Sequence, residues 1–144
     1  MKPTPAAKAA LSAIAIVAAL CAALLPVAAD AFVWFGSGQP ERFFAEPRTI
    51  TLQMLLASGP FWVTALLIPS GVLTHNRGRV RNGLAAGFAL TLAMWAWTAW
   101  DGYSYQVDPG ASGGANIGLG LVMLASPAII LLVMIVMIGR ARAS

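Results

Sequence analysis

The most conspicuous side chains with binding chemistry are aromatic, and they cluster in the stretch "MWAWTAWDGYSY". Aromatic faces bind cations, so such a cluster could form a cage for a cationic ligand. At about 100° per residue, however, the three indoles point in different directions, with Trp95 roughly opposite Trp97 and Trp100. Tryptophan and tyrosine are also enriched where a helix leaves a membrane, because an amphipathic ring suits the headgroup layer. We therefore expect an outer interface belt made of Trp34, Trp95, Trp97, Trp100, Tyr103 and Tyr105. The alternative is an outward-facing cage, in which Trp97 and Trp100 meet Tyr103, Tyr105 or Trp34.

Patterns typical of catalytic or metal sites are missing from the sequence. It has five acids and one histidine, His75, which do not form paired carboxylates, a nucleophile with its base, or a metal-ligand set. The single cysteine, Cys21, lies inside an apolar run, where we interpret it as a small buried hydrophobic residue. We therefore expect no enzymatic activity, no cofactor and no metal site.

A titratable residue inside a membrane helix often marks a transport pathway, and Asp30 is the candidate here. It lies near the outer end of the first apolar stretch, where an acid at headgroup level is the ordinary interpretation. In a protein that transports nothing, Asp30→Asn should be nearly silent. In a transporter the same change should abolish flux.

Four apolar stretches must position these residues. The chain is 59% hydrophobic and 10% charged, whereas soluble proteins average about 25% charged residues. About 20 residues of helix cross the hydrocarbon core of a bilayer, and a backbone in lipid must satisfy its own polar groups. We therefore predict an all-α integral membrane protein with one domain, a four-transmembrane-helix bundle with short loops. Its spans should lie at about 9–33, 51–73, 84–100 and 117–139.

The basic residues predict the orientation of this bundle. Seven of the nine cations lie in the amino terminus, the second connector and the tail, at Lys2, Lys8, Arg77, Arg79, Arg81, Arg140 and Arg142. The positive-inside bias then places both termini in the cytoplasm, where we expect anionic headgroup contacts from His75, Arg77, Arg79 and Arg81. The same arginines could contact nucleic-acid phosphates. Topology and lipid headgroups explain them better, so we expect no nucleic-acid partner.

The first apolar stretch has a second interpretation. Its basic start, apolar core and "VAADA" pattern resemble a secretory signal peptide cleaved after Ala29 or Ala31. Removal of residues 1–29 or 1–31 would leave three helices and an unchanged orientation for the rest. Apolarity continues through "AFVWF", however, which favours an uncleaved span.

Small residues recur at helical spacing in the last two stretches. They are Gly83, Ala86, Gly87, Ala89, Ala93 and Ala96 in the third, and Gly114, Gly118 and Ala125 in or near the fourth. Such faces let helices approach closely in lipid, where no hydrophobic force drives helix against helix. We interpret them as packing faces within the bundle, with a docking face for a partner as the alternative.

These features lead to two hypotheses about function. The first is a non-catalytic, small multi-pass membrane protein that lies in the lipid bilayer. It would act as an accessory or assembly subunit and dock to a larger membrane protein or to another copy of itself. The second is a small oligomeric transporter or channel subunit whose polar residues converge on a wet path, namely Gln53, Ser58, Thr64, Ser70, Thr91, Thr98 and Ser126. The Ala/Gly/Arg-rich composition and short loops favour a bacterial cytoplasmic (inner) membrane.

Overall fold

The computed structural model describes residues 4–43, 45–71, 76–110 and 116–139, with side chains in the last range described from residue 120. Its four long helices are α1 (Pro5–Gly36), α2 (Pro47–Ser70), α3 (Arg77–Val107) and α4 (Asn116–Gly139), and a 3-10 helix, η1 (Pro40–Arg42), follows α1. The described residues contain no strand. All four helices are long and apolar enough to cross a membrane. The prediction of an all-helical chain with four candidate spans is confirmed.

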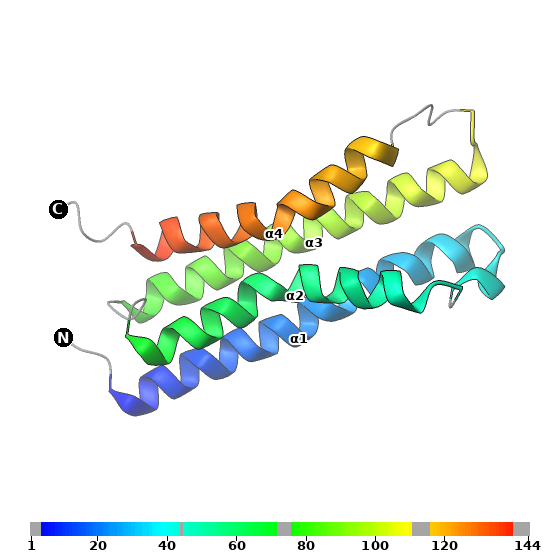
Figure 1. Cartoon of the computed structure of the whole chain (residues 1–144). Coiled ribbons are helices and arrows are strands. Elements are labelled where there is room, and N and C mark those ends of the chain that lie inside the picture. Colours follow the sequence, from blue (N-terminus) through cyan, green and yellow to red (C-terminus); the bar gives the residue numbers. More distant parts are fainter. Residues whose placement is uncertain (1–3, 44, 72–75, 111–115, 140–144) are drawn as a thin grey trace.

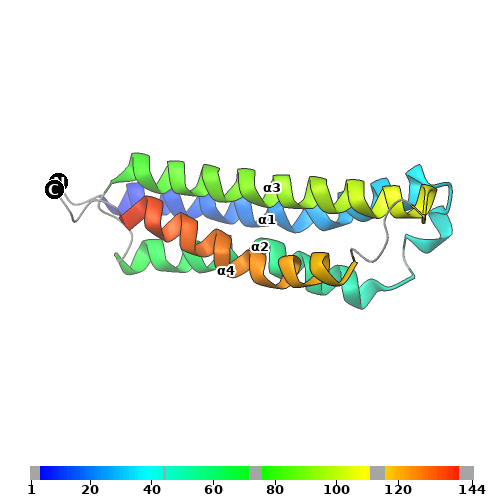
Figure 2. The same cartoon turned by 90° about the horizontal axis from the view of Figure 1, so that it is seen from above.

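Successive helices run antiparallel (Figures 1 and 2). α1 contacts α2 and α3, and α4 contacts the same two helices. Within the described residues α1 and α4 do not contact each other, so the helices form a ring in the order α1, α2, α4, α3. The core of the protein therefore lies in the middle of this ring and is formed by residues of all four helices.

The helix ends are set by local capping chemistry. The Thr4 hydroxyl accepts a hydrogen bond from the backbone N–H of Ala7, and Pro5 occupies the first turn of α1. At the start of α3, the Asn76 side chain accepts from the backbone N–H groups of Gly78 and Arg79. Gly71 ends α2 with a φ of 83°, a left-handed conformation that suits glycine.

These caps change the predicted boundaries. Residues 77–83 and 101–107 were expected in connectors, but both stretches are helical and belong to α3. The reason is that Asn76 begins the helix before the arginines, and no proline interrupts it before Pro109. With 32 and 31 residues, α1 and α3 are each longer than α2 and α4, which have 24. At about 1.5 Å per residue, the longer pair extends well beyond a hydrocarbon core about 30 Å thick.

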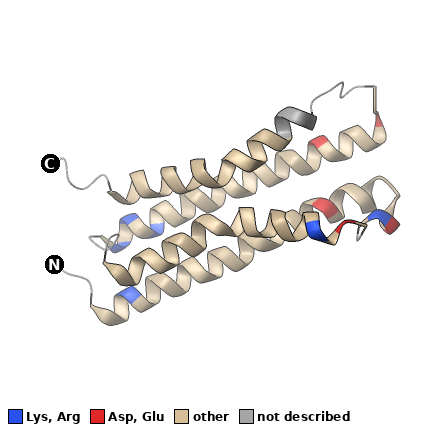
Figure 3. Cartoon of the chain, viewed as in Figure 1, with Lys and Arg blue, Asp and Glu red and all other residues tan. Residues whose placement is uncertain are grey.

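Charge separates the two ends of the bundle (Figure 3). One end, here called the basic end, holds the first turns of α1 and α3, which carry Lys8, Arg77, Arg79 and Arg81. The opposite, acidic end holds the last part of α1 and α3, η1 and the start of α2, with Asp30, Glu41, Glu46, Asp101, Asp108, Arg42 and Arg48. Both the first turn of α1 and the last turn of α4 lie at the basic end (Figure 1). This separation is the arrangement that the positive-inside interpretation requires.

The half of the bundle nearer the basic end is filled by a buried cluster. On α1 its contributions are small, with Ala15, Ala19 and Ala22 each 0% exposed. Opposite them α2 buries two large side chains completely, Phe61 and Ile68. The alanine face of α1 therefore makes room for large residues of its neighbour, which gives close packing without relying on a hydrophobic force.

Glycines bring α3 and α4 together in the same half. A Cβ atom placed on Gly83 would lie 2.8 Å from Ile138 Cγ1, and one on Gly87 would lie 2.7 Å from Met134 Cγ. Carbon atoms in ordinary contact are about 3.5–4.0 Å apart. At these two positions a side chain larger than hydrogen has no space unless Ile138, Met134 or the whole of α4 moves.

Candidate functional site

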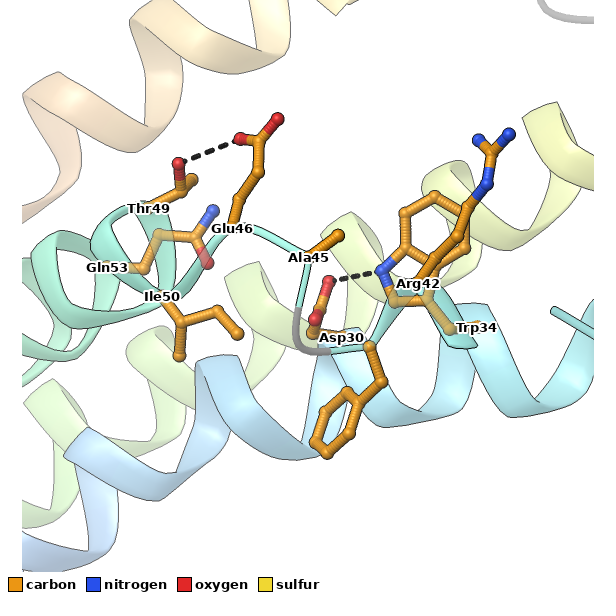
Figure 4. A pocket seen from close by; sticks show the side chains of 9 residues that line it. Asp30, Trp34, Arg42, Ala45, Glu46, Thr49, Ile50 and Gln53 are labelled. Carbon is orange, nitrogen blue, oxygen red and sulfur yellow. Dashed lines mark hydrogen bonds between the residues drawn. The ribbon is translucent and has the colours of Figure 1, made fainter. Parts of the chain in front are cut away.

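Two adjoining pockets at the acidic end form the candidate site. The first has a volume of about 420 Å³ and lies between α1, η1 and the start of α2 (Figure 4). The second has a volume of about 240 Å³ and lies mainly between α1 and α3. Asp30, Trp34 and Gln53 line both pockets. The site is therefore organised around the part of α1 that lies at the acidic end.

Asp30 and Trp34 are joined directly. The indole N–H of Trp34 donates to Asp30 Oδ1 at 2.9 Å, as Figure 4 shows. Residues four apart in a helix lie on the same face, so the continuous α1 helix fixes this pair. The Asp30 side chain is half-buried, and the described part of the chain provides it with no ion pair and no second hydrogen bond. Its other carboxylate oxygen is available to a ligand.

The side chain of Arg42 lies over the indole ring of Trp34. Its guanidinium carbon lies 5.6 Å from the centroid of the Trp34 ring, within the range of a cation–π contact. Pro40 starts η1, the short turn that brings Arg42 over the indole. In Figure 4 the guanidinium group points away from Asp30, in agreement with the absence of an ion pair between them. Arg42 therefore holds Trp34 without neutralising the carboxylate.

The α3 side of the second pocket carries another carboxylate and a buried indole. Asp101 is half-buried and makes no hydrogen bond or ion pair within the described residues. Trp95 is 3% exposed, and its indole nitrogen has no hydrogen-bond partner among the residues that the structure describes. Both residues line the pocket together with Asp30. Two carboxylates from separate helices thus share one small cavity, and neither has an ion-pair partner in the described part of the chain.

Close contacts between the tips of α1 and α3 hold this pocket together. The rings of Phe32 and Tyr103 lie with their centroids 5.4 Å apart. A Cβ atom on Gly36 would lie 3.2 Å from the Tyr103 ring, and one on Gly102 would lie 3.1 Å from Val33. The two long helices therefore approach each other closely at the acidic end, where a Cβ atom on either glycine would require its neighbour to move by a few tenths of an ångström.

The residues predicted to form the interface belt occupy different environments. Trp97 and Trp100 are 57% and 63% exposed near the acidic end, and Tyr105 is also exposed. Trp34 and Tyr103 are half-buried in the contacts described above. Trp95 does not belong to a belt, because it is buried in the core between α1 and α3. The angular spacing did place it opposite Trp97 and Trp100, and that side of α3 faces inward.

The small-residue face of α3 also needs correction. Gly83 and Gly87 are buried against α4 and Ala86 is half-buried, but Ala89, Ala93 and Ala96 are exposed. On α4, Ala125 is exposed and the surroundings of Gly118 are not among those described; Gly114 lies outside the described residues. The packing interpretation is therefore wrong for the three exposed alanines within this chain. The alanine face that does pack is on α1, where alanine is so frequent that no single face stands out in the sequence.

Cys21 and the basic residues also have defined positions. Cys21 is exposed on α1, so its interpretation as a buried residue is wrong. Arg77 donates to the Thr4 hydroxyl at 3.3 Å, and with Arg81 it lines a groove of about 270 Å³ beside the first turns of α1. Arg79 is half-buried, and His75 lies outside the described residues. Headgroup binding by these residues stays a prediction.

The hydroxyl groups expected to line a wet path are satisfied within their own helices. Five of these hydroxyl groups each donate a hydrogen bond, at 2.7 to 2.9 Å, to the backbone carbonyl oxygen three or four residues earlier. They belong to Ser58, Thr64, Thr91, Thr98 and Ser126. Four of them are buried, and Thr98 is half-buried. Only Gln53 and Thr98 of the predicted polar set line the pockets at the acidic end. The structure therefore brings few of these groups together.

Neither metal ligation nor similarity to other proteins adds to this geometry. Within the described residues, no group of three or more histidine, cysteine or acidic side chains could hold a metal ion. Comparisons with protein-family models, curated proteins and solved structures found no match. The interpretation of the site thus rests on the arrangement of its own residues.

Proposed function

We propose that this protein is a non-catalytic accessory or assembly subunit that docks to a larger membrane protein through α3. The observation that carries the proposal is the exposed row of Ala89, Ala93 and Ala96, here called the alanine row. These residues recur at spacings of four and three and therefore lie along one side of the helix. No other described helix of the chain covers them.

The physical argument concerns the distance at which another helix can approach. In lipid, helix association depends on van der Waals contact and polar bonds, and small side chains permit the shortest distance between backbones. The alanine row is flanked by exposed large residues, including Leu90, Leu92 and Trp97. A partner helix can contact the α3 backbone along the row while these flanking side chains pack against its sides.

The proposed location is the bacterial cytoplasmic membrane, with the basic end in the cytoplasm. Four apolar helices support a membrane protein, and the separation of charge supports this orientation. In this arrangement the alanine row lies within the bilayer and leads toward the outer surface, where exposed Trp97 and Trp100 follow it. A partner would then meet the subunit mainly within the membrane.

Site-specific photocrosslinking in native membranes tests the docking proposal. A photoreactive amino acid at position 93 should give a discrete crosslink to one membrane protein, identified by mass spectrometry. The same probe at position 13, an exposed alanine on α1, is the matched control and should give none. Ala89→Leu should abolish the crosslink while leaving the chain folded, because a larger side chain separates the two backbones. Equal crosslinking from positions 93 and 13 would refute docking through α3.

A small transporter or channel subunit is the second candidate, and the pockets around Asp30 favour it. They offer a half-buried carboxylate to a solute at the acidic end. The buried cluster in the other half, however, fills the space through which a solute would have to continue. Reconstituted vesicles discriminate the two candidates: a flux lost in Asp30→Asn but retained in Asp108→Asn would replace the accessory function with transport.

A further inference from the structure

We propose that the pocket between α1 and α3, here called the α1–α3 pocket, binds a small organic ammonium ion that enters from the acidic end. This binding site goes beyond the docking function and is independent of the alanine row. Four features of the pocket carry the proposal: its charge, its aromatic surface, its size and one unpaired donor.

The charge of the pocket favours a cation. Asp30 and Asp101 line it from the neighbouring helices α1 and α3, and its lining contains no lysine, arginine or histidine. Neither carboxylate has an ion-pair partner within the described residues. The surrounding end of the bundle carries five acids and two arginines, a difference of three negative charges. A cation in the pocket would therefore be attracted both locally and from a distance.

The walls of the pocket favour an organic cation over a metal ion. Trp34, Trp95 and Tyr105 line it with aromatic surface, which attracts ammonium groups through cation–π interactions. Calcium requires about six to eight oxygen ligands, and the described residues contain no suitable cluster of three acidic, histidine or cysteine groups. The cavity of about 240 Å³ is smaller than the usual site for a drug-sized molecule. A compact ammonium ion fits these properties.

Trp95 narrows the ligand class further. Its side chain is 3% exposed, and its indole N–H has no acceptor, although buried tryptophan nitrogens usually find one. The nitrogen itself is closed off from the pocket, so the Trp95 ring must turn before a ligand oxygen close to the ammonium group can accept from it. The geometry therefore points to amino alcohols, in which a hydroxyl or ester oxygen lies two carbons from the nitrogen. Choline and ethanolamine, free or as lipid headgroups, share this chemistry.

The test uses the full chain in nanodiscs of phosphatidylglycerol, which contain no amine headgroup. Choline chloride is titrated at constant ionic strength against sodium chloride, and binding is followed by tryptophan fluorescence. We expect a saturable change that sodium does not produce. Asp30→Asn and Asp101→Asn should each weaken the apparent affinity by about tenfold or more, because each removes a charged partner. Asp108→Asn is the matched control, since Asp108 is exposed and does not line the pocket.

Three further arms separate binding from structural damage and identify the ligand source. Asp30→Glu should recover much of the affinity lost in Asp30→Asn, because it restores the charge. Trp95→Phe should reduce the preference for choline over tetramethylammonium, which has no oxygen. In nanodiscs containing phosphatidylethanolamine, a lower apparent affinity for free choline would show that lipid headgroups fill the pocket, and an unchanged affinity would assign it to free amines. A non-saturable response, or equal affinities in Asp30→Asn, Asp101→Asn and Asp108→Asn, would overturn the proposal.

Discussion

The contact between α3 and α4 allows one substitution to be worked out in detail, Gly87→Ala. The added Cβ atom would lie 2.7 Å from Met134 Cγ, whereas ordinary carbon contacts are about 3.5–4.0 Å. About one ångström must therefore be recovered by moving Met134 or by separating the helices. Met134 is 0% exposed, so its side chain has little space in which to move.

The expected free energy follows from two opposing effects. Overpacking a buried site costs about 1–3 kcal/mol, while replacing glycine by alanine inside a helix gains up to about 1 kcal/mol. We expect Gly87→Ala to lower the free energy of unfolding by about 1–2 kcal/mol. Gly120→Ala on α4 is the matched control, because its Cβ meets nothing within 4 Å. The control should leave stability unchanged or raise it slightly.

Reversible unfolding in mild detergent, followed by tryptophan fluorescence, measures both variants. The double variant Gly87→Ala with Met134→Ala separates steric conflict from other effects. Because the shortened side chain leaves room for the new methyl group, the double variant should lose less stability than the sum of the two single variants. If Gly87→Ala were as stable as Gly120→Ala, or if the double variant were strictly additive, the close approach of α3 and α4 at this position would be refuted.

Three other substitutions examine the core, a helix cap and the orientation. Phe61→Ala should lower the free energy of unfolding by about 3–5 kcal/mol. Trp62→Ala should lower it much less, because Phe61 is 0% and Trp62 is 40% exposed. Similar losses of stability for the two variants in the same unfolding assay would contradict the assigned core. Asn76→Ala should lower the free energy of unfolding by about 1 kcal/mol. It should also speed hydrogen exchange at the backbone amides of Gly78 and Arg79, which donate to the Asn76 side chain. Unchanged exchange at these two amides would argue against the cap. Replacing Arg77, Arg79 and Arg81 together by glutamine should scramble the orientation of reporter fusions at the carboxyl terminus. A uniform, unaltered orientation would remove these residues from the topology argument.

The existence of four helices long and apolar enough to span a membrane could be predicted, because it depends on composition and segment length, which a sequence displays directly. The inward face of each span could not. In a soluble helix, polarity marks the exposed face, but in lipid both faces are apolar and the pattern gives relative angles alone. The angular opposition of Trp95 and Trp97 was thus correct, while the assignment of Trp95 to the surface was wrong. For the same reason Ala93 was predicted to pack inside the bundle, although it is exposed, and the buried face of α1 that contains Ala19 was not predicted.

The candidate site was predictable only in part for a different reason. Asp30 could be singled out as the one acid in an apolar stretch, but its position near the outer end gave no sign of a cavity. The pocket depends on Asp101, a residue distant in the sequence, and on contacts between the tips of α1 and α3. Residues 101–107 were assigned to a connector, and a flexible connector would not hold Asp101 in place. Recognising that α3 continues to Val107 would have been necessary to foresee the site.

The hydroxyl groups that bond within their own helices bear on how the protein is made. Thr64 and Thr91 each donate to a carbonyl of the preceding turn, so these polar groups need no neighbouring helix to be tolerated in lipid. In the proposed membrane protein, α2 can therefore enter the bilayer before α3 is synthesised, and α3 before α4. The helices then assemble after insertion, through the fit of alanine and glycine surfaces to larger side chains. The order in which the ribosome delivers the helices need not be the order in which they associate.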